Sequence, residues 1–272
     1  MYCLFETRKE EGARPHQMSE ECYRTVKEAL DKTRTMREVI EGYQYFHDAL
    51  LELEIWCRQA NRSGEYLLRN LHKAERLSRA VLFEYRTYLD HLQTTFAKKY
   101  GKESDILRIF REGTHRAYDT CPEYAFVYQL RNNMQHFDSI VHSFEAPKKM
   151  NYLQPCSIPE ILLRDGGWKE PERAFIELAK GNIDLQKAFE ATYNAMEYIQ
   201  VPVMQYFLDL NDGAGEITML RNWIDGIFPR EESRYYHLAE VDDHGNVTAF
   251  PVYWEAIYQI TDAMRARGEE DT

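Results

Sequence analysis

The sequence predicts an all-α protein: a helical bundle followed by a helical extension that contains one small β-hairpin. Apolar residues recur at spacings of three and four over long stretches, which is the period of an amphipathic helix. The 272 residues include only 13 glycines and 9 prolines, which favours helices over a turn-rich β architecture. A hydrophobic content of 44% with 29% charged residues is typical of a globular chain that buries a substantial core.

The first part of the chain is expected to hold an arm and one long helical stretch. Residues 1–17, which are rich in charge, are predicted to form a flexible arm. Ser19 is a residue type that caps helix N-termini, and Glu20 and its neighbour follow in the first turn, where the helix dipole favours acidic side chains. Helical periodicity then continues almost unbroken to Asn61.

The helices that follow complete the predicted bundle, which covers residues 18–150. One long helix is expected from about residue 65 to Gly101, which has the residue type of a C-cap, and a short one over residues 103–116. Pro122 suits the first turn of the next helix, which we predict to reach Ser143. Spacings of three, four, three and four give that helix an apolar seam: Val127, Leu130, Met134, Phe137 and Val141.

Three prolines between Ala146 and Pro159 interrupt the helical period, and the bundle is expected to end there. Residues 151–272 are predicted to form the helical extension. Its longest helical stretch covers about residues 183–209, where Pro202 predicts a kink or a break.

The end of the chain combines a hairpin with a last helix. Residues alternate between apolar and polar over 238–252, around the turn-forming run from Asp243 to Asn246, which predicts a β-hairpin. A helix is then expected over about residues 253–267.

Charge and cysteine content exclude several classes of protein. The formal net charge of -11 does not attract polyanions through the overall field, which counts against an extended nucleic-acid groove but leaves room for a small basic site. The five cysteines are far apart and form no CxxC pair, so neither a zinc knuckle nor a disulfide framework is indicated. With no apolar signal-peptide core and no long apolar run, the sequence predicts no membrane span and a cytoplasmic location.

One motif carries chemistry: Arg131-Asn132-Asn133-Met134-Gln135-His136. On a helix, Asn132 and His136 are neighbours one turn apart on the face opposite the apolar seam, and the long side chain of Arg131 can swing toward that face. A histidine can take a proton from a 2′-hydroxyl or give one to a leaving oxygen. An arginine can hold a phosphate as negative charge builds, and an asparagine can orient the substrate or the imidazole. These three residues are the predicted catalytic set.

This hexad resembles the catalytic signature of the HEPN superfamily, in which an arginine and a polar residue precede a histidine by a fixed spacing. The flanks, a long helical pair before the motif and a stretch like Ile161–Asp165 with Trp168 after it, are similar to those of uncharacterised bacterial HEPN-like proteins. The resemblance is specific over about residues 120–145, weaker to about 205, and absent beyond.

The resemblance implies a helical bundle that forms a homodimer across the motif helix, with two such helices face to face. It implies a metal-independent endoribonuclease, without cofactor, in a toxin–antitoxin or phage-defence setting with an antitoxin or regulatory partner. Arg131 would bind phosphate, Asn132 would be its polar companion, and His136 the acid and base. Many members carry a modifiable tyrosine two residues after the histidine; here Asp138 stands there, which puts that regulation in doubt.

Two other pairings are better explained by chance or solvation. Arg86 and His91 repeat the arginine–histidine spacing without the amide that follows in the motif. Glu112 and His115 have a Glu-x-x-His spacing, but a di-iron bundle needs a second such pair and two more glutamates, so no metal is predicted.

The alternative function left open is a catalytically silent helical interaction protein, or scaffold, that uses the same helix face for dimerisation or partner binding. The acidic net charge of -11 favours it. The Arg131, Asn132 and His136 combination favours the nuclease, because an interface has no need for that set.

Overall fold

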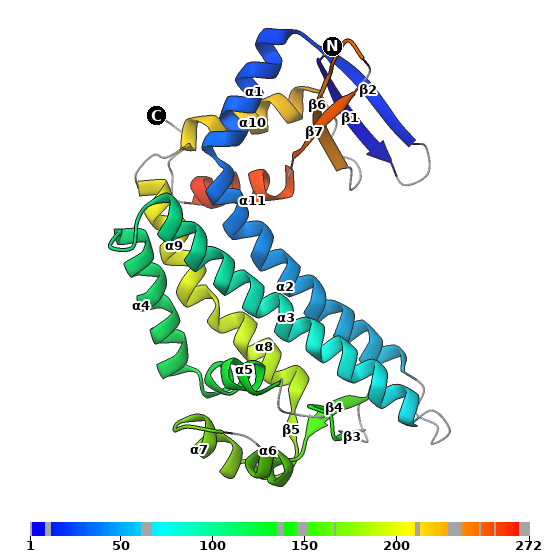
Figure 1. The fold of residues 1–272 in the computed structure, drawn as a ribbon, viewed down its shortest axis with the longest axis vertical. Helices are drawn as coiled ribbons and strands as arrows, with labels where there is room; N and C mark the ends of the chain where they lie inside the picture. The colour runs from blue at the N-terminus through cyan, green and yellow to red at the C-terminus, as the bar shows by residue number, and fades with distance from the viewer. Residues whose placement is uncertain are drawn as a thin grey trace. The chain divides into compact units, whose positions relative to one another are not determined.

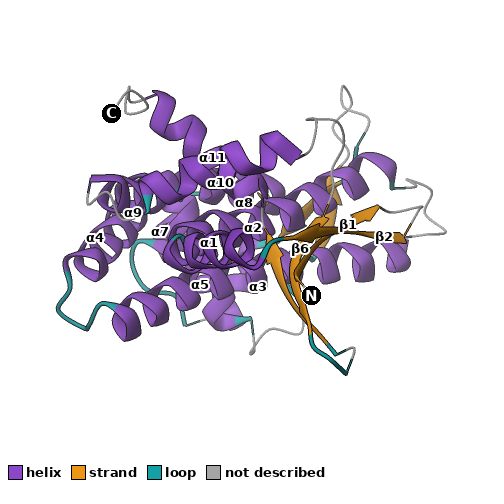
Figure 2. Ribbon diagram, turned by 90° about the horizontal axis from the view of Figure 1, so that it is seen from above, coloured by secondary structure: helices purple, strands orange, loops and turns teal. Residues whose placement is uncertain are grey.

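Helices dominate the described residues, as predicted (Figure 2), and the strands among these residues form two small antiparallel sheets. The computed structural model describes residues 2–8, 12–60, 67–134, 139–145, 152–165, 167–209, 213–227, 235–244, 246–252 and 254–266. Contacts divide the chain into two compact units, which we call unit 1 (Met1–Glu41 and Met204–Thr272) and unit 2 (Gly42–Val203). The boundaries fall inside two helices, α2 and α9, and not at residues 17 and 150 as the sequence predicted.

Unit 1 contains a four-stranded antiparallel sheet of order β2-β1-β6-β7 (Figure 1). Buried residues pair across its centre, where Leu4 faces Leu238. Helix α10 packs against both α1 and α11. The elements are β1 (Tyr2–Arg8), β2 (Gly12–Met18), α1 (Glu20–Lys32), α2 (Arg34–Gln59), α9 (Glu197–Asp209), α10 (Ala214–Ile227), β6 (Tyr235–Val241), β7 (Val247–Val252) and α11 (Trp254–Ala266).

The predicted flexible arm over residues 1–17 is wrong, because this segment forms the hairpin β1–β2. β1 lies inside the sheet and pairs with β2 on one side and with β6 on the other. Since β6 begins only at Tyr235, the pairing that orders β1 comes from the far end of the sequence and leaves no local signal. The hairpin predicted near residues 238–252 is confirmed as β6–β7, and the Ser19 cap is confirmed by its Oγ, which accepts from the backbone N of Cys22 at 3.1 Å.

Unit 2 is a helical bundle built around buried aromatic rings. Phe46 of α2 contacts Tyr85 of α3 with ring centroids 5.6 Å apart, and Tyr85 meets Tyr124 of α5 edge to face at 5.7 Å. A small sheet of order β3-β4-β5 lies at one end. The elements are α3 (Leu67–Lys99), α4 (Asp105–Thr120), α5 (Pro122–Asn133), β3 (Ser143–Glu145), β4 (Gln154–Ser157), α6 (Pro159–Asp165), α7 (Glu172–Glu177), β5 (Ile183–Asp184) and α8 (Leu185–Ala195).

The end of α3 follows the sequence rules, whereas the helical stretch around Pro202 does not break at the proline. Gly101, at φ 100°, lies just after α3, in the left-handed region that glycine adopts without strain. Pro202 lies inside α9, and the break in the helical stretch comes earlier, at Met196 between α8 and α9.

Pro202 has no N–H to give to the carbonyl of Tyr198, one turn earlier in α9. That carbonyl oxygen approaches Gly113 of α4 so closely that a Cβ on Gly113 would lie 2.5 Å from it. The missing side chain therefore lets α4 and α9 cross at close range and fixes the position of α4.

No helix among the described residues is both long enough and apolar enough to cross a membrane.

Candidate functional site at the end of helix α5

Helix α5, which carries the first residues of the motif, is buried on most of its surface. It begins at Pro122 after the cap residue Cys121, as the sequence predicted. Val127 and Leu130 of the predicted seam are buried. Residues beside the seam are buried too, among them Tyr124 and Phe126, so the helix has no broad face in water. The expectation of a one-sided amphipathic helix is therefore wrong for its described part.

The structure places two of the three predicted catalytic residues. Arg131 and Asn132 lie in the last turn of α5, and both side chains are half-buried. The backbone N of Met134 bonds to the carbonyl of Arg131 at 3.3 Å, which tightens this last turn. His136 lies outside the described residues, as do Phe137 of the predicted seam and Asp138.

The helix ends at Asn133 and not near Ser143, because Glu75 of α3 holds the following segment in a different conformation. Its Oε2 accepts from the backbone N of Val141 at 2.8 Å, from the backbone N of Ile140 at 3.0 Å and from Ser139 Oγ at 2.9 Å. Arg79 Nε donates to the other oxygen, Oε1. A charged acceptor makes these hydrogen bonds strong, so they outweigh the local helical pattern.

His142 locks the same segment to β4. Its backbone N donates to the carbonyl of Cys156 at 2.9 Å. Its ring Nδ1 accepts from the backbone N of Ile158 at 3.0 Å, so Nε2 carries the proton and donates to the carbonyl of Ser139, also at 3.0 Å. A neutral histidine with both ring nitrogens engaged is structural. The segment from Ser139 to His142 is therefore held by Glu75 of α3 and by β4.

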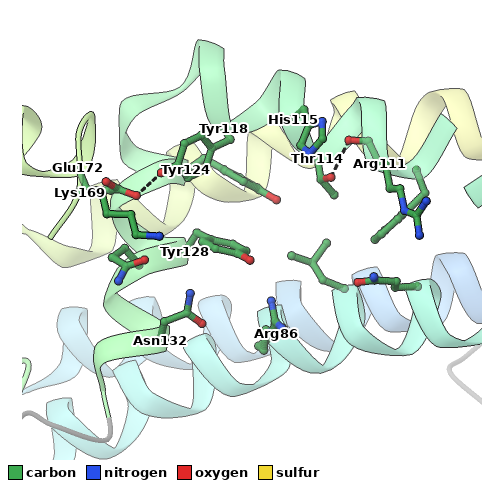
Figure 3. Close-up of a pocket in the computed structure, with 14 residues that line it drawn as sticks. Arg86, Arg111, Thr114, His115, Tyr118, Tyr124, Tyr128, Asn132, Lys169 and Glu172 are labelled. Atoms are coloured by element: carbon green, nitrogen blue, oxygen red, sulfur yellow. Dashed lines mark hydrogen bonds between the residues drawn. The ribbon is translucent and has the colours of Figure 1, made fainter. Parts of the chain in front are cut away.

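A cavity of about 570 Å³ in unit 2 adjoins the end of α5 (Figure 3). Helices α3, α4 and α5 form its walls together with the segment from Lys169 to Glu172. Aromatic rings cover much of the interior, and Tyr118 meets Tyr128 edge to face with centroids 6.0 Å apart. Asn132 of the motif is one of the lining residues.

Three formal positive charges line the cavity against a single carboxylate. Arg86 Nε forms an ion pair with Asp90 at 2.8 Å, and its guanidinium lies 5.7 Å from the centroid of the Tyr128 ring. Burial disfavours that charge, but Asp90 and Tyr128 outweigh it and leave the pKa of Arg86 raised. Arg111 and Lys169 are exposed at the cavity and have no ion pair within the described part of the chain. His115 lies beside Arg111 on α4 (Figure 3).

The one carboxylate of the cavity, that of Glu172, is only half engaged. Its side chain is 1% exposed, and Oε1 accepts a hydrogen bond from Tyr118 OH (Figure 3). Burial, followed by this hydrogen bond to Glu172, raises the pKa of Tyr118, so the phenol keeps its proton. Oε2 is buried and has no hydrogen-bond partner among the described residues.

The sequence anticipated only part of this site. Asn132 lines the cavity, whereas Arg131 is not one of its lining residues. Arg86 and His115, whose pairings in the sequence looked accidental, both line the cavity. Lys169 and the buried glutamate were missed, because their segment lies more than 30 residues after α5 in the sequence and no spacing rule connects the two.

The Glu112–His115 pair has no metal-site geometry in the described residues, where no cluster of three or more His, Cys, Asp or Glu side chains occurs. Glu112 instead accepts from Arg108 Nη1 at 3.0 Å, one turn earlier on α4.

The described part of the site is therefore the last turn of α5 with Arg131 and Asn132, beside a cavity with excess positive charge. In comparisons with known proteins, no family model, no curated protein and no solved structure matches the chain.

Proposed function

We propose that this chain is a metal-independent endoribonuclease of HEPN type that cleaves RNA at a site shared by two copies of the chain. One observation carries the proposal: Arg131 and Asn132 lie together in the last turn of α5, beside a cavity with excess positive charge in a chain whose net charge is -11. Local positive charge at close range can hold a phosphodiester even though the distant acidic surface is screened.

In the proposed reaction the 2′-oxygen of a ribose attacks the adjacent phosphorus, and the bond from phosphorus to the 5′-oxygen of the next nucleotide breaks. His136 of one copy accepts the proton of the 2′-hydroxyl, and His136 of the other copy donates a proton to the leaving 5′-oxygen. Arg131 stabilises the charge that develops on the phosphoryl oxygens, and Asn132 orients the substrate. The products are a 2′,3′-cyclic phosphate and a 5′-hydroxyl.

The half-burial of Arg131 and Asn132 supports such a role. A fully buried arginine could not reach a phosphodiester, and a fully exposed one would hold it weakly because water screens the charge. Glu75 also holds Ser139, Ile140 and Val141, the described residues that follow the motif in the chain.

The proposed setting is a toxin–antitoxin or phage-defence system, in which an antitoxin or regulatory protein restrains the nuclease. The second candidate is a catalytically silent interaction protein. Its supporting observation is that Arg131 is absent from the lining of the cavity, so its guanidinium can serve a protein contact instead.

The test compares wild type with His136→Ala on several structured and unstructured RNAs in the presence of a chelator. The matched control is His244→Ala, which removes an exposed histidine in the turn between β6 and β7. We expect wild type and His244→Ala to cleave and His136→Ala to lose at least about 100-fold of the rate, as loss of a general acid–base does. Cleavage that survives His136→Ala contradicts the proposal, and no cleavage by any of the three proteins favours the interaction role.

A further inference from the structure

We propose that the water-facing side of α3 binds a single strand of RNA through a stripe of four residues: Arg69, His72, Arg76 and Phe83. The proposal rests on the proposed nuclease activity and adds the surface that holds the RNA beyond the cleaved bond. Three observations on the described residues support it: exposed arginines without an ion pair, an exposed aromatic ring in line with them, and the contact of the same helix with the candidate site.

The four residues of the stripe follow the period of a helix. They lie at intervals of three, four and seven residues within α3, so their side chains project from one face. All four are exposed, and the ring of Phe83 is 62% exposed. The opposite side of the helix carries its buried residues, which include Ala74, Leu77, Val81 and Tyr85. The stripe is therefore the face that α3 turns to water.

The positive charge of the stripe is not compensated. Arg69 and Arg76 have no ion pair within the described part of the chain. Lys73, which lies toward α2, is instead paired with Glu52 of that helix at 3.8 Å. His72 adds an imidazole that can donate a hydrogen bond to a phosphate oxygen. In a chain whose net charge is -11, such a local group of cations is where a polyanion would bind.

The acidic side chains of α3 lie off the stripe. Glu75 and Asp90 are already engaged by arginines one turn away on the same helix. Glu84 is next to Phe83 in the sequence, and a helix turns successive side chains about 100° apart. Along the described length of α3, no carboxylate therefore lies within the stripe to repel a phosphate.

The spacing along α3 suits a polymer better than one small anion. Arg69 and Arg76 are seven residues apart, and so are Arg76 and Phe83, which separates each pair by about 10 Å along the helix axis. The two arginines would therefore contact different phosphates of one strand. Phe83 can stack only on a base that is not already stacked and paired in a duplex, so the stripe favours single-stranded RNA.

The same helix reaches the candidate site. Glu75 of α3 accepts a hydrogen bond from the backbone N of Val141 at 2.8 Å. Arg86 of α3 lines the cavity together with Asn132 of α5 (Figure 3). The part of α3 from Glu75 to Arg86 therefore lies beside the last turn of α5, and a strand held on the stripe is presented to that turn.

The test measures the fluorescence anisotropy of a labelled 2′-O-methyl oligonucleotide, which has the phosphates and bases of RNA but cannot be cleaved by 2′-hydroxyl attack. We expect the full chain to bind the single strand more tightly than the same strand in a duplex. Arg69→Ala and Arg76→Ala should each weaken binding about tenfold and reduce the slope of log Kd against log salt by about 0.7. Phe83→Ala should weaken binding about tenfold with the slope unchanged, because stacking releases no counterion.

Two matched controls should bind as wild type does. Arg24→Ala removes an exposed arginine of α1, and Leu178→Ala removes an exposed apolar side chain after α7. Equal effects of the stripe and control variants, equal affinity for single strand and duplex, or no binding by wild type overturns the proposal. Weaker binding to phosphatidylserine vesicles, with RNA binding unchanged, overturns it in favour of a membrane surface.

This binding test and the cleavage assay can fail separately. Because the probe is not cleaved, the stripe can hold RNA in a protein that proves to have no nuclease activity. Conversely, cleavage that needs His136, together with stripe variants that bind as wild type does, would keep the nuclease and overturn the stripe.

Discussion

Two regions of unit 2 are organised around a single glutamate each, and the two carboxylates differ in how completely they are used. At the end of α5, both oxygens of Glu75 accept hydrogen bonds, from Arg79 and from the segment that follows the motif. At the cavity, Glu172 has one oxygen engaged by Tyr118 and the other without a partner in the described residues. A carboxylate with hydrogen bonds on both oxygens stabilises the fold, whereas a buried carboxylate with one oxygen unpartnered indicates a place for a ligand.

The substitution Glu75→Gln tests this comparison with the largest expected effect. We expect a loss of about 3 kcal/mol of folding free energy, because a neutral amide accepts more weakly and turns an N–H toward donors it cannot pair with. The variant should also lower RNA cleavage, if wild type cleaves, because the chain after His136 loses its anchor. Chemical denaturation measures the first effect, with Glu84→Gln on the same helix as the control. Equal stability of the two variants would show that the Glu75 contacts are not structural.

A second variant, Gly113→Ala, disturbs the wall of the cavity without touching its lining. The added Cβ would lie 2.5 Å from the carbonyl oxygen of Tyr198, so α4 or α9 must shift. Overpacking of this kind costs about 2 kcal/mol. Gly226→Ala in α10 is the matched control, because no described atom lies within 4 Å of the place its methyl group would take. Thermal unfolding that is unchanged by Gly113→Ala would contradict the close crossing.

Glu41, a partly satisfied carboxylate in unit 1, extends the comparison to pH. Burial, opposed by Arg37, raises its pKa from 4.5 to about 7. The pKa of Glu41 is therefore higher in the folded protein than in the unfolded chain. The protonated Glu41 side chain makes its full contribution to stability below pH 4.5, and this contribution is lost as the pH rises through 7. Glu41→Gln should therefore match wild type near pH 4.5 and be more stable by about 2 kcal/mol near pH 8, a value reduced for partial exposure. Denaturation of both proteins at the two pH values measures this, and an equal difference at both would contradict it.

The smallest expected effect is on the stability of Glu172→Gln. Because one carboxylate oxygen has no partner in the described residues, exchange for a neutral amide should change the free energy of unfolding by less than about 1 kcal/mol, or increase it. This contrasts with the loss expected for Glu75→Gln, and the same denaturation experiment compares them. A loss as large as that of Glu75→Gln would show that Glu172 is structural and not a ligand group.

The sequence predicted the elements whose signals are local. The Ser19 cap, the start of α5 at Pro122 and the end of α3 before Gly101 depend on residues within one turn, and all three are confirmed. The hairpin β6–β7 is confirmed for the same reason, since its turn residues lie between its two strands.

The features that the sequence could not predict depend on distant partners. The strand β1 is ordered by β6, and the end of α5 is set by Glu75, more than one helix away in the chain. The apolar spacing through Val141 predicts a helix. Local spacing cannot show that the carboxylate of Glu75 on α3 accepts hydrogen bonds from the backbone N–H groups of this segment. The cavity combines four segments and the burial of Glu172, which is visible only in three dimensions.

The central claim, that the end of α5 handles RNA by 2′-hydroxyl attack without a metal, is tested most directly with a DNA pool that carries one ribonucleotide between randomised flanks. In chelator, we expect cleavage only after that ribonucleotide, with a 2′,3′-cyclic phosphate on one product and a 5′-hydroxyl on the other. Cleavage of the matching pool with a 2′-O-methyl ribonucleotide, products that carry a 5′-phosphate, or no cleavage at the ribonucleotide would contradict it.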